Sequence, residues 1–316
     1  MPVIGRFAPS PSGRLHLGNL ACSLLAWLSA VSAGGRVVLR IEDLDAERCP
    51  RRWADQLEED LSWLGLHWQE GGSGGGPHAP YYQSERSALY AAAYEKLASA
   101  GLVYPCFCSR SQLHAASAPH RSDGQVVYPG VCYGLSPQQA AARAAKRPPA
   151  MRLHVPARTV SFVDGHLGPY SEYLPTDCGD FVLRRGDGVY AYQLAVVVDD
   201  AAMGVTQVVR GADLLSSTPR QLLLYQLLGL PQPQFFHLPL LLDADGRRLS
   251  KRDGDASLEN LRGRFSAEEI VGRLAYVYGL NPGAGPRTPE SLLADFSWDK
   301  VPREDICLPR GLFDKA

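Results

Sequence analysis

Apolar residues along this chain alternate between short continuous runs and stripes at helical spacing. Residues 37–41 (VVLRI) form a nearly continuous apolar run, as in strands that are buried on both faces. Within residues 50–64, Trp53, Leu57 and Leu61 recur on one helical stripe. This alternation predicts a mostly parallel β-sheet flanked by helices. The expected strands are 3–7, 37–41, 206–210 and 236–242, with buried-strand composition also over 189–200, and the expected helices are 17–32, 50–64, 84–100, 214–228 and 266–278.

The same pattern divides the chain into parts. Residues 71–77 (GGSGGGP) are expected to form a flexible surface connection. From residue 102 to about residue 185 the chain changes to short strand-like pieces with many prolines and three clustered cysteines. We therefore expect a sheet domain in two halves, 1–101 and 186–255, which is split by an inserted subdomain over 102–185 and followed by a short helical tail over 256–316.

Composition indicates a globular protein without an overall basic character. Of the 316 residues, 45% are hydrophobic and 21% are charged, which excludes a disordered or fibrous chain. The formal net charge is −1, so any contact with a nucleic acid must be local. The basic candidates for such a contact are Arg143, Lys146, Arg147, Arg184 and Arg185.

Targeting signals and disulfide bonds are not favoured. No apolar run reaches the ~18 residues that a membrane-spanning helix needs. Residues 20–31 follow Arg6 and Arg14 and have the length of a signal-peptide core, but the breaking residues just upstream and the helical pattern favour an ordinary helix. The seven cysteines are odd in number and three are clustered, which predicts a cytoplasmic protein with one metal site rather than a disulfide framework. Nothing in the sequence demands more than a monomer.

Two segments carry the candidate chemistry. Residues 6–19 (RFAPSPSGRLHLGN) bring His16 to the start of the first expected helix, where free backbone N–H groups and the helix dipole favour an anion. Gly18 has no side chain to block the close approach of a nucleotide. Residues 247–252 (RRLSKR) place four cations within six residues after the last expected strand. A cationic loop can neutralise a triphosphate as pyrophosphate departs, although a solvated surface loop has the same composition.

Together and in this order, the two segments resemble the signatures of class I aminoacyl-tRNA synthetases. HLGN at 16–19 stands in the place of their HIGH signature, with Asn19 instead of the second histidine, and LSK at 249–251 stands in their KMSKS loop. The segments similar to the glutamyl-tRNA synthetase branch are RFAPSPSG (6–13), RIEDLD (40–45), YQLAVVVDD (192–200) and VVRGADLL (208–215). The resemblance covers roughly residues 1–265. It implies an α/β fold with a Rossmann-like parallel sheet, an inserted zinc-containing subdomain and a short helical C-terminal region.

The resemblance also implies how ATP binds. Mg²⁺ is expected to accompany the nucleotide, and His16 and Lys251 are expected to act in catalysis by stabilising its phosphate charge. The implied ATP-binding residues are His16, Gly18, Asn19, Leu249, Ser250 and Lys251.

A free glutamate offers one ammonium and two carboxylates, and the sequence supplies a partner for each. Glu42, at the end of a buried strand, can bind the ammonium. Arg6 and Arg210, at ends of expected strands, can bind carboxylates bidentately. Tyr192 and Ser10 can add hydrogen bonds, and the resemblance assigns all five positions to glutamate. The alternative is a structural salt bridge between Arg6 and Glu42.

A cysteine cluster predicts a metal site. Cys106 and Cys108, with Cys132 further along the chain, have the spacing of a closed tetrahedral zinc site that needs a fourth ligand. His114 and His120 in the intervening loop are the better ligands on general grounds. By resemblance the fourth ligand is instead Tyr128, in a Tyr-x-Gly-x-Cys segment. One structural zinc per chain is expected, and the alternative is a set of reduced buried thiols.

Only 64 residues follow Arg252. Ordinary glutamyl-tRNA synthetases continue into a helical anticodon-binding domain, which we do not expect here. The shortness resembles a smaller branch of the family, which activates glutamate with ATP and transfers it to queuosine in the anticodon loop of tRNA(Asp). The expected partners are therefore ATP, L-glutamate and queuosine-containing tRNA(Asp). Two alternatives stay open: a compact glutamyl-tRNA synthetase that charges the tRNA 3′ end, and a catalytically silent RNA-binding relic.

Overall fold

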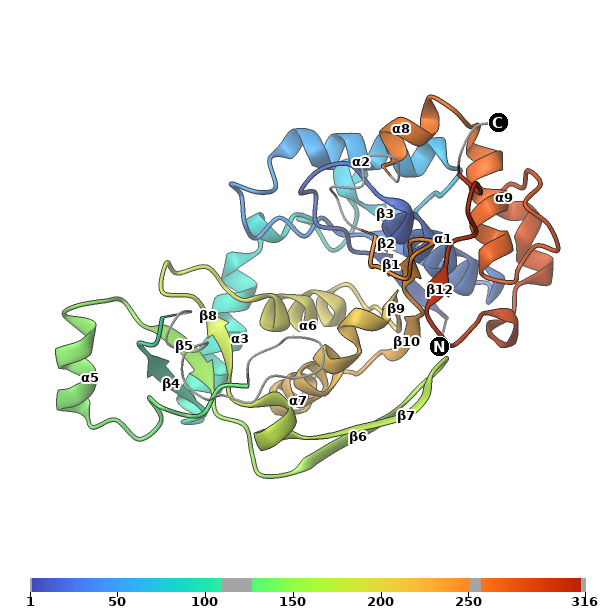
Figure 1. Cartoon of the computed structure of the whole chain (residues 1–316). Helices are drawn as coiled ribbons and strands as arrows, with labels where there is room; N and C mark the ends of the chain where they lie inside the picture. The colour runs from blue at the N-terminus through green and yellow to red at the C-terminus, as the bar shows by residue number, and fades with distance from the viewer. Residues whose placement is uncertain (1, 110–126, 250–256, 314–316) are drawn as a thin grey trace.

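A parallel sheet lies at the centre of the structure, a computed structural model that describes residues 2–109, 127–249 and 257–313 (Figure 1). Strands β1 (Ile4–Phe7), β2 (Arg36–Leu39) and β3 (Glu70–Gly71) pair in parallel in that order, and β9 (Gln207–Gly211) pairs in parallel with β10 (Gln234–Leu238). The two sets lie side by side, because the Thr206 N–H donates to the Ile4 carbonyl oxygen at 3.0 Å.

Helices cover both faces of this sheet. One buried apolar cluster contains α1 (Leu17–Ser32), α2 (Arg51–Trp63) and α9 (Ala267–Val277), and a second contains α3 (Ser87–Ser99), α6 (Tyr192–Ala202) and α7 (Thr218–Leu228). Successive strand residues alternate between the clusters: Val37 and Leu39 belong to the first, and Val38 to the second. The expected α/β class with a parallel sheet is confirmed, and residues 20–31 are the interior of the core helix α1.

The buried-strand interpretation of residues 189–200 is wrong, because the chain enters α6 at Tyr192. Residues 194–198 are all buried, since α6 packs against both α3 and α7. A helix that is buried on every side is apolar on every side, so its composition matches that of a buried strand. Asp199 and Asp200 near the end of α6 are buried as well, and arginines pair with both.

The prediction of a flexible surface connection over residues 71–77 is wrong for its first two residues, Gly71 and Gly72, which are buried. Gly71 lies in β3 with a φ of +106°, and a Cβ atom there would lie 2.0 Å from the Leu39 carbonyl oxygen. Gly72 has a φ of +57°, and a Cβ atom there would lie 2.6 Å from the Glu58 carboxylate. The glycines therefore let the chain turn tightly against β2.

Alanine at position 71 is expected to destabilise the protein. Gly71→Ala should lower the free energy of unfolding by more than about 2 kcal/mol. The new Cβ atom would clash with the Leu39 carbonyl oxygen, and the alanine backbone would have to keep a positive φ that is unfavourable for any residue with a side chain. Gly74→Ala is the matched control, since a Cβ at Gly74 would meet nothing within 4 Å. Denaturant unfolding measures both variants, and equal stabilities would contradict the close packing of Gly71 on β2.

The chain between α3 and α6 forms a smaller sheet and a hairpin, at some distance from α8 (Leu258–Arg262) and α9 (Figure 1). β4 (Val103–Cys106), β5 (Ala150–Leu153) and β8 (Phe181–Arg184) pair antiparallel, and α5 (Pro137–Ala144) lies beyond them. β6 (Thr159–Asp164) and β7 (Gly168–Tyr173) form a hairpin that packs against β10 and α7 through β6. The hairpin thus ties this part of the chain to the central sheet.

The C-terminal segment packs back onto the central domain. β12 (Ile306–Cys307) pairs in parallel with β11 (Leu241–Leu242). The expected strand 236–242 is divided into β10 and β11, and Pro239, which has no backbone N–H to donate, lies between them. The segment also contains two short 3₁₀ helices, Glu290–Asp295 and Trp298–Lys300. In the described ranges no helix has the length and apolar character to span a membrane.

Candidate functional site

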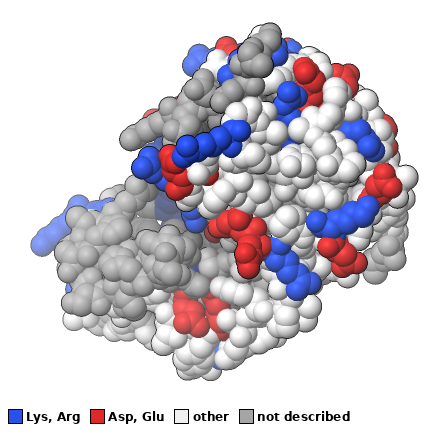
Figure 2. All heavy atoms as spheres, turned by 45° about the vertical axis from the view of Figure 1, so that its right-hand side comes forward, with Lys and Arg blue, Asp and Glu red and all other residues white. Residues whose placement is uncertain are grey.

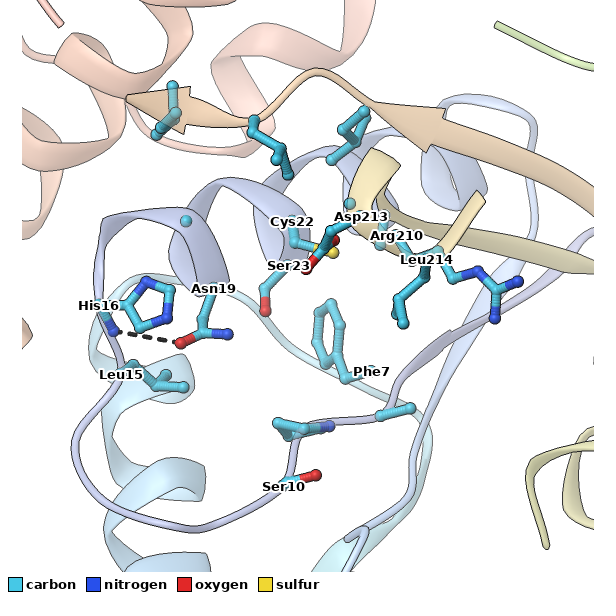
Figure 3. A pocket seen from close by; sticks show the side chains of 18 of the residues that line it. Phe7, Ser10, Leu15, His16, Asn19, Cys22, Ser23, Arg210, Asp213 and Leu214 are labelled. Atoms are coloured by element: carbon cyan, nitrogen blue, oxygen red, sulfur yellow. Dashed lines mark hydrogen bonds between the residues drawn. The ribbon is translucent and has the colours of Figure 1, made fainter. Parts of the chain in front are cut away.

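A cavity of about 650 Å³ lies where the carboxyl ends of β1 and β9 meet the start of α1. This volume suits a small-molecule site. In Figure 3, His16 and Asn19 lie on one side of the cavity, and Arg210 and Asp213 lie across from them. Ser250 and Lys251 lie outside the described residues. The wall contains every other residue predicted for ATP or glutamate: Arg6, Ser10, His16, Gly18, Asn19, Glu42, Tyr192, Arg210 and Leu249.

The amino end of α1 forms one wall of the cavity. His16 is the residue that precedes the first turn, and its backbone N–H donates to the Asn19 side-chain oxygen at 3.4 Å (Figure 3). Asn19, the third residue of α1, therefore satisfies the backbone N–H of the N-cap residue His16, as in a capping box, and it also lines the cavity. A Cβ atom on Gly18 would lie 3.2 Å from the His16 ring, so glycine at this position also leaves room for the imidazole.

The described residues before the cationic loop line this cavity, and those after it contact residues of its wall. Arg248 forms a bridge to Leu242, and both Arg248 and Leu249 line the cavity. On the other flank, Ser257 forms a bridge to His16, and the Leu258 N–H donates to the Leu15 carbonyl at 2.8 Å. Leu249 before the segment 250–256 therefore lies in the cavity wall, and Ser257 after it lies beside the amino end of α1.

A buried network of charged side chains lies under the cavity. Arg40 is at the centre of this network, and it was assigned no role from the sequence. Arg40 is completely buried and donates to Asp200 at 2.6 Å and to Glu42 at 3.0 Å. Its Nε lies 3.8 Å from Asp199, which also accepts a 2.6 Å hydrogen bond from Arg86. The available signal in the sequence was a single cation inside the apolar run 37–41.

Glu42 lines the cavity while remaining largely buried. Burial raises the pKa of its carboxyl group, and the charge and hydrogen bond of Arg40 oppose that increase. The ion pair is with Arg40, so the alternative of a structural salt bridge between Arg6 and Glu42 is not what the structure has. A cation that entered the cavity would favour the ionised form of Glu42.

Arg6 and Arg210 are buried arginines with unfilled hydrogen-bonding capacity. Arg6 donates to the Val209 carbonyl at 2.8 Å, and its Nε, 3.8 Å from Asp200, has no hydrogen-bond partner among the described residues. Arg210 donates through Nε to His237 at 3.0 Å and through Nη2 to Thr218 at 2.8 Å. Its Nη1 is buried without a partner in that part of the chain. Both arginines can therefore accommodate an incoming carboxylate.

Three further side chains complete the wall. Tyr192 is the first residue of α6, and burial raises the pKa of its hydroxyl, which keeps it protonated as a donor. Ser10 is exposed at the turn after β1. Asp213 also lines the cavity, although sequence reasoning gave it no role. Its position in VVRGADLL, three residues after Arg210, was the signal that could have identified it.

The cysteine cluster is separate from this cavity. The sulfur atoms of Cys106, Cys108 and Cys132 lie within 4.8 Å of one another, and those of Cys108 and Cys132 are 3.7 Å apart. The Tyr128 hydroxyl oxygen is 3.4 Å from the Cys106 sulfur and 3.8 Å from the Cys108 sulfur. A tetrahedral zinc ion with Zn–S bonds of about 2.3 Å separates two sulfurs by about 3.8 Å. The four residues could therefore hold such an ion; His114 and His120 lie outside the described residues.

The basic candidates for RNA contact lie in the same region. Arg143, Lys146 and Arg147 are exposed at the end of α5, Arg185 is exposed after β8, and Arg184 is half-buried. Arg143 also donates to the Cys132 sulfur at 3.7 Å, so it supports the cluster. On the face shown in Figure 2, the Lys and Arg side chains of the described residues are interspersed with Asp and Glu side chains.

The chain is similar to class I tRNA synthetases over most of its length. The family model "tRNA synthetases class I (E and Q), catalytic domain" matches residues 2–275. The chain is 53% identical to the glutamyl-Q tRNA(Asp) synthetase of Symbiobacterium thermophilum, over 97% of this chain and 96% of that protein. It is 48% identical to the glutamyl-Q tRNA(Asp) synthetase of Nitratidesulfovibrio vulgaris, over 99% and 98% of the two chains.

Glutamate–tRNA ligases are also similar, over part of their length. The chain is 46% identical to glutamate–tRNA ligase 1 of Halorhodospira halophila, over 88% of this chain and 59% of the ligase. A crystal structure of a glutamate tRNA ligase from Elizabethkingia meningosepticum in complex with its amino acid superposes with a TM-score of 0.84 at 28% identity. That superposition covers 99% of this chain and 68% of the ligase.

Proposed function

This chain belongs to the class I tRNA synthetases for glutamate and glutamine, and on that premise we propose that it activates glutamate with ATP and transfers it to queuosine in tRNA(Asp). The observation that carries the proposal is the single cavity in which two buried arginines and Glu42 meet the amino end of α1. The two glutamyl-Q tRNA(Asp) synthetases of Symbiobacterium and Nitratidesulfovibrio are matched over 96% and 98% of their length, whereas the Halorhodospira ligase is matched over 59%.

The proposed amino-acid site pairs each charge of glutamate with a side chain of the cavity. Arg6 and Arg210 bind the carboxylates through the nitrogens that have no hydrogen-bond partner among the described residues. Glu42 binds the ammonium, with Arg40 holding its carboxylate in place. Tyr192 donates a hydroxyl hydrogen bond, and Ser10 contacts the backbone end of the substrate.

The proposed first step is adenylation. An oxygen of the α-carboxylate of glutamate attacks the α-phosphorus of ATP in line. The ATP enters with Mg²⁺ as MgATP, and the bond from the α-phosphorus to the bridging oxygen of pyrophosphate breaks, giving glutamyl-adenylate. His16 and the amino end of α1 stabilise the charge at the α-phosphate, and Gly18, Asn19 and Leu249 line the nucleotide side. Lys251 holds the β- and γ-phosphates as they leave, and Ser250 contributes to ATP binding. This chemistry needs positioning and electrostatic stabilisation, and no protein nucleophile takes part.

The proposed second step moves glutamate to the RNA. A hydroxyl oxygen of the cyclopentenediol ring of queuosine attacks the glutamyl carbonyl carbon. The bond from that carbon to the phosphate oxygen breaks, AMP leaves, and the hydroxyl proton is released to the departing AMP phosphate or to water. The acceptor is a vicinal diol, like the terminal ribose of a tRNA, so one catalytic cavity can serve either acceptor when the RNA docks differently.

We also propose that the cysteine cluster holds one structural zinc ion. Cys106, Cys108, Tyr128 and Cys132 would supply four ligands, and a closed tetrahedral site leaves no open position for chemistry. When bound, the ion would fix the segment that follows β4 to the loop that contains Cys132.

Two measurements test the proposed function. Glutamate-dependent exchange of pyrophosphate into ATP without tRNA tests adenylation. Mass analysis of nucleosides from tRNA(Asp) after incubation with glutamate and ATP then tests transfer. Two tRNA substrates separate the acceptors: one carries queuosine and lacks the terminal adenosine, and the other has an intact 3′ end and lacks queuosine.

The expected result is glutamate on the first tRNA and none on the second. Transfer to the second tRNA alone would instead identify a compact glutamyl-tRNA synthetase. Absence of exchange and transfer with a folded protein would favour an RNA-binding relic.

A further inference from the structure

His237 lies behind Arg210 and has no role in the site described above. It belongs to β10, next to the β9 strand that carries Arg210, and it is completely buried. The Arg210 Nε–H donates to its Nε2 at 3.0 Å, and the Thr218 hydroxyl lies 3.3 Å from the same nitrogen. Because an arginine can only donate, Nε2 of His237 must be an acceptor.

The contacts of the other ring nitrogen, Nδ1, show where the His237 ring carries its proton. His237 Nδ1 lies 2.6 Å from the Asp164 Oδ2, at the end of β6. The Asp164 Oδ1 accepts backbone N–H groups of His166 at 3.0 Å, Leu167 at 2.9 Å and His237 itself at 3.1 Å. The carboxylate is therefore fixed in position, and the imidazole carries its proton on Nδ1.

We propose that His237 is a positioning residue for the acidic amino-acid pocket: as a neutral imidazole held by Asp164, it orients the Arg210 guanidinium toward a substrate carboxylate. This inference rests on the proposed function, in which Arg210 binds glutamate. Among the described residues, the charged groups that act on the ring are Asp164 on β6, Arg210 on β9 and Arg6 on β1. A protonated His237 would be a third cation beside the two arginines. Burial lowers the pKa of the imidazole and so does the charge of Arg210, against the hydrogen bond to Asp164, which raises it.

Asp164→Asn tests the proposal with little change of shape. The asparagine oxygen can keep the three backbone hydrogen bonds, while its NH₂ group replaces the oxygen that faces His237. The ring must then accept at Nδ1 and carry its proton on Nε2, against the Arg210 Nε–H. We expect the KM for glutamate in pyrophosphate exchange to rise about tenfold or more, with the KM for ATP within about twofold of the wild type.

Two further comparisons separate positioning from a general loss of structure. Asp180→Asn is the matched control, because Asp180 also contacts a histidine, His154 at 3.2 Å. The two residues lie next to the ends of β8 and β5 in the smaller sheet, away from Arg210. This control variant should leave both KM values unchanged. His237→Gln can still accept from Arg210, so its KM for glutamate should lie closer to the wild-type value than that of His237→Leu.

The outcomes are distinguishable. Wild-type exchange with an unchanged KM for glutamate in Asp164→Asn would overturn the role of His237 and leave the proposed function intact. Absence of glutamate-dependent exchange in the wild type would overturn both. Nitrogen NMR of the histidine rings gives an independent readout: the wild type should show a His237 ring with its proton on Nδ1, and a proton on Nε2 would contradict the proposal.

Discussion

Replacing Lys251 by alanine is expected to reduce glutamate-dependent pyrophosphate exchange by about 10²- to 10³-fold, because the charge of the departing pyrophosphate loses its cationic partner. Lys251 is outside the described residues, but the described residues on either side of its segment line the cavity or contact a residue of its wall. Leu249 is part of the wall, and Ser257 forms a bridge to His16. The KM for glutamate should change little, since Arg6 and Arg210 remain.

Lys300→Ala is the control for this prediction. Lys300 lies in a C-terminal 3₁₀ helix, where its ammonium donates to the Asp295 carbonyl at 2.7 Å, and it does not line the cavity. The rate of pyrophosphate exchange by Lys300→Ala should equal that of the wild type. If Lys251→Ala also exchanged at the wild-type rate, the cationic loop would have no part in adenylation.

Loss of the metal from the cysteine cluster is expected to reduce the thermal stability of the protein strongly. The purified protein should contain about one zinc per chain, and Cys108→Ala should contain none. Burial raises the pKa of the metal-free Cys108 thiol to about 11, so zinc must displace its proton and the affinity should fall as the pH falls. We expect Cys108→Ala, or chelation of the wild type, to lower the thermal unfolding midpoint by about 10 °C.

Elemental analysis and thermal unfolding check this second prediction, with Cys307→Ser as control. Cys307 is an exposed thiol in β12, so its replacement should change neither the zinc content nor the midpoint. Exchange without tRNA should persist in Cys108→Ala, because the cluster is separate from the cavity. A wild-type protein that binds no zinc and is unaffected by chelators would show that the cluster is a set of reduced thiols.

Local sequence information was sufficient for much of the central domain. The strands and helices from β1 to α2, and the helix α9, follow directly from hydrophobic spacing. The residues predicted to meet around His16 do line one cavity wherever the structure describes them. The positions of these elements could be predicted because each segment carries its own signal: an apolar run, a helical stripe, or a glycine and proline turn that leads into a helix.

Other features depend on which segments meet in space. Residues 192–202 form a helix rather than a strand because α3 and α7 enclose them, and an enclosed helix has the composition of an enclosed strand. The glycines at 71 and 72 look like a linker in sequence but turn tightly against β2 and Glu58. No local pattern contains this information.

The sequence by itself determined the class of fold, the motifs at His16 and at the cationic loop, and the spacing of the cysteines, because each depends on residues close together in the chain. Only the tertiary structure decided that Arg40 lies under Glu42, and that Asp164 and His237 lie behind Arg210. The physical reason is that a buried polar side chain needs a partner for its hydrogen bonds or its charge, and the local sequence does not say which residue that partner is. Asp164 and His237 are 73 residues apart, and hydrogen bonds of this kind form only when the fold brings their elements together.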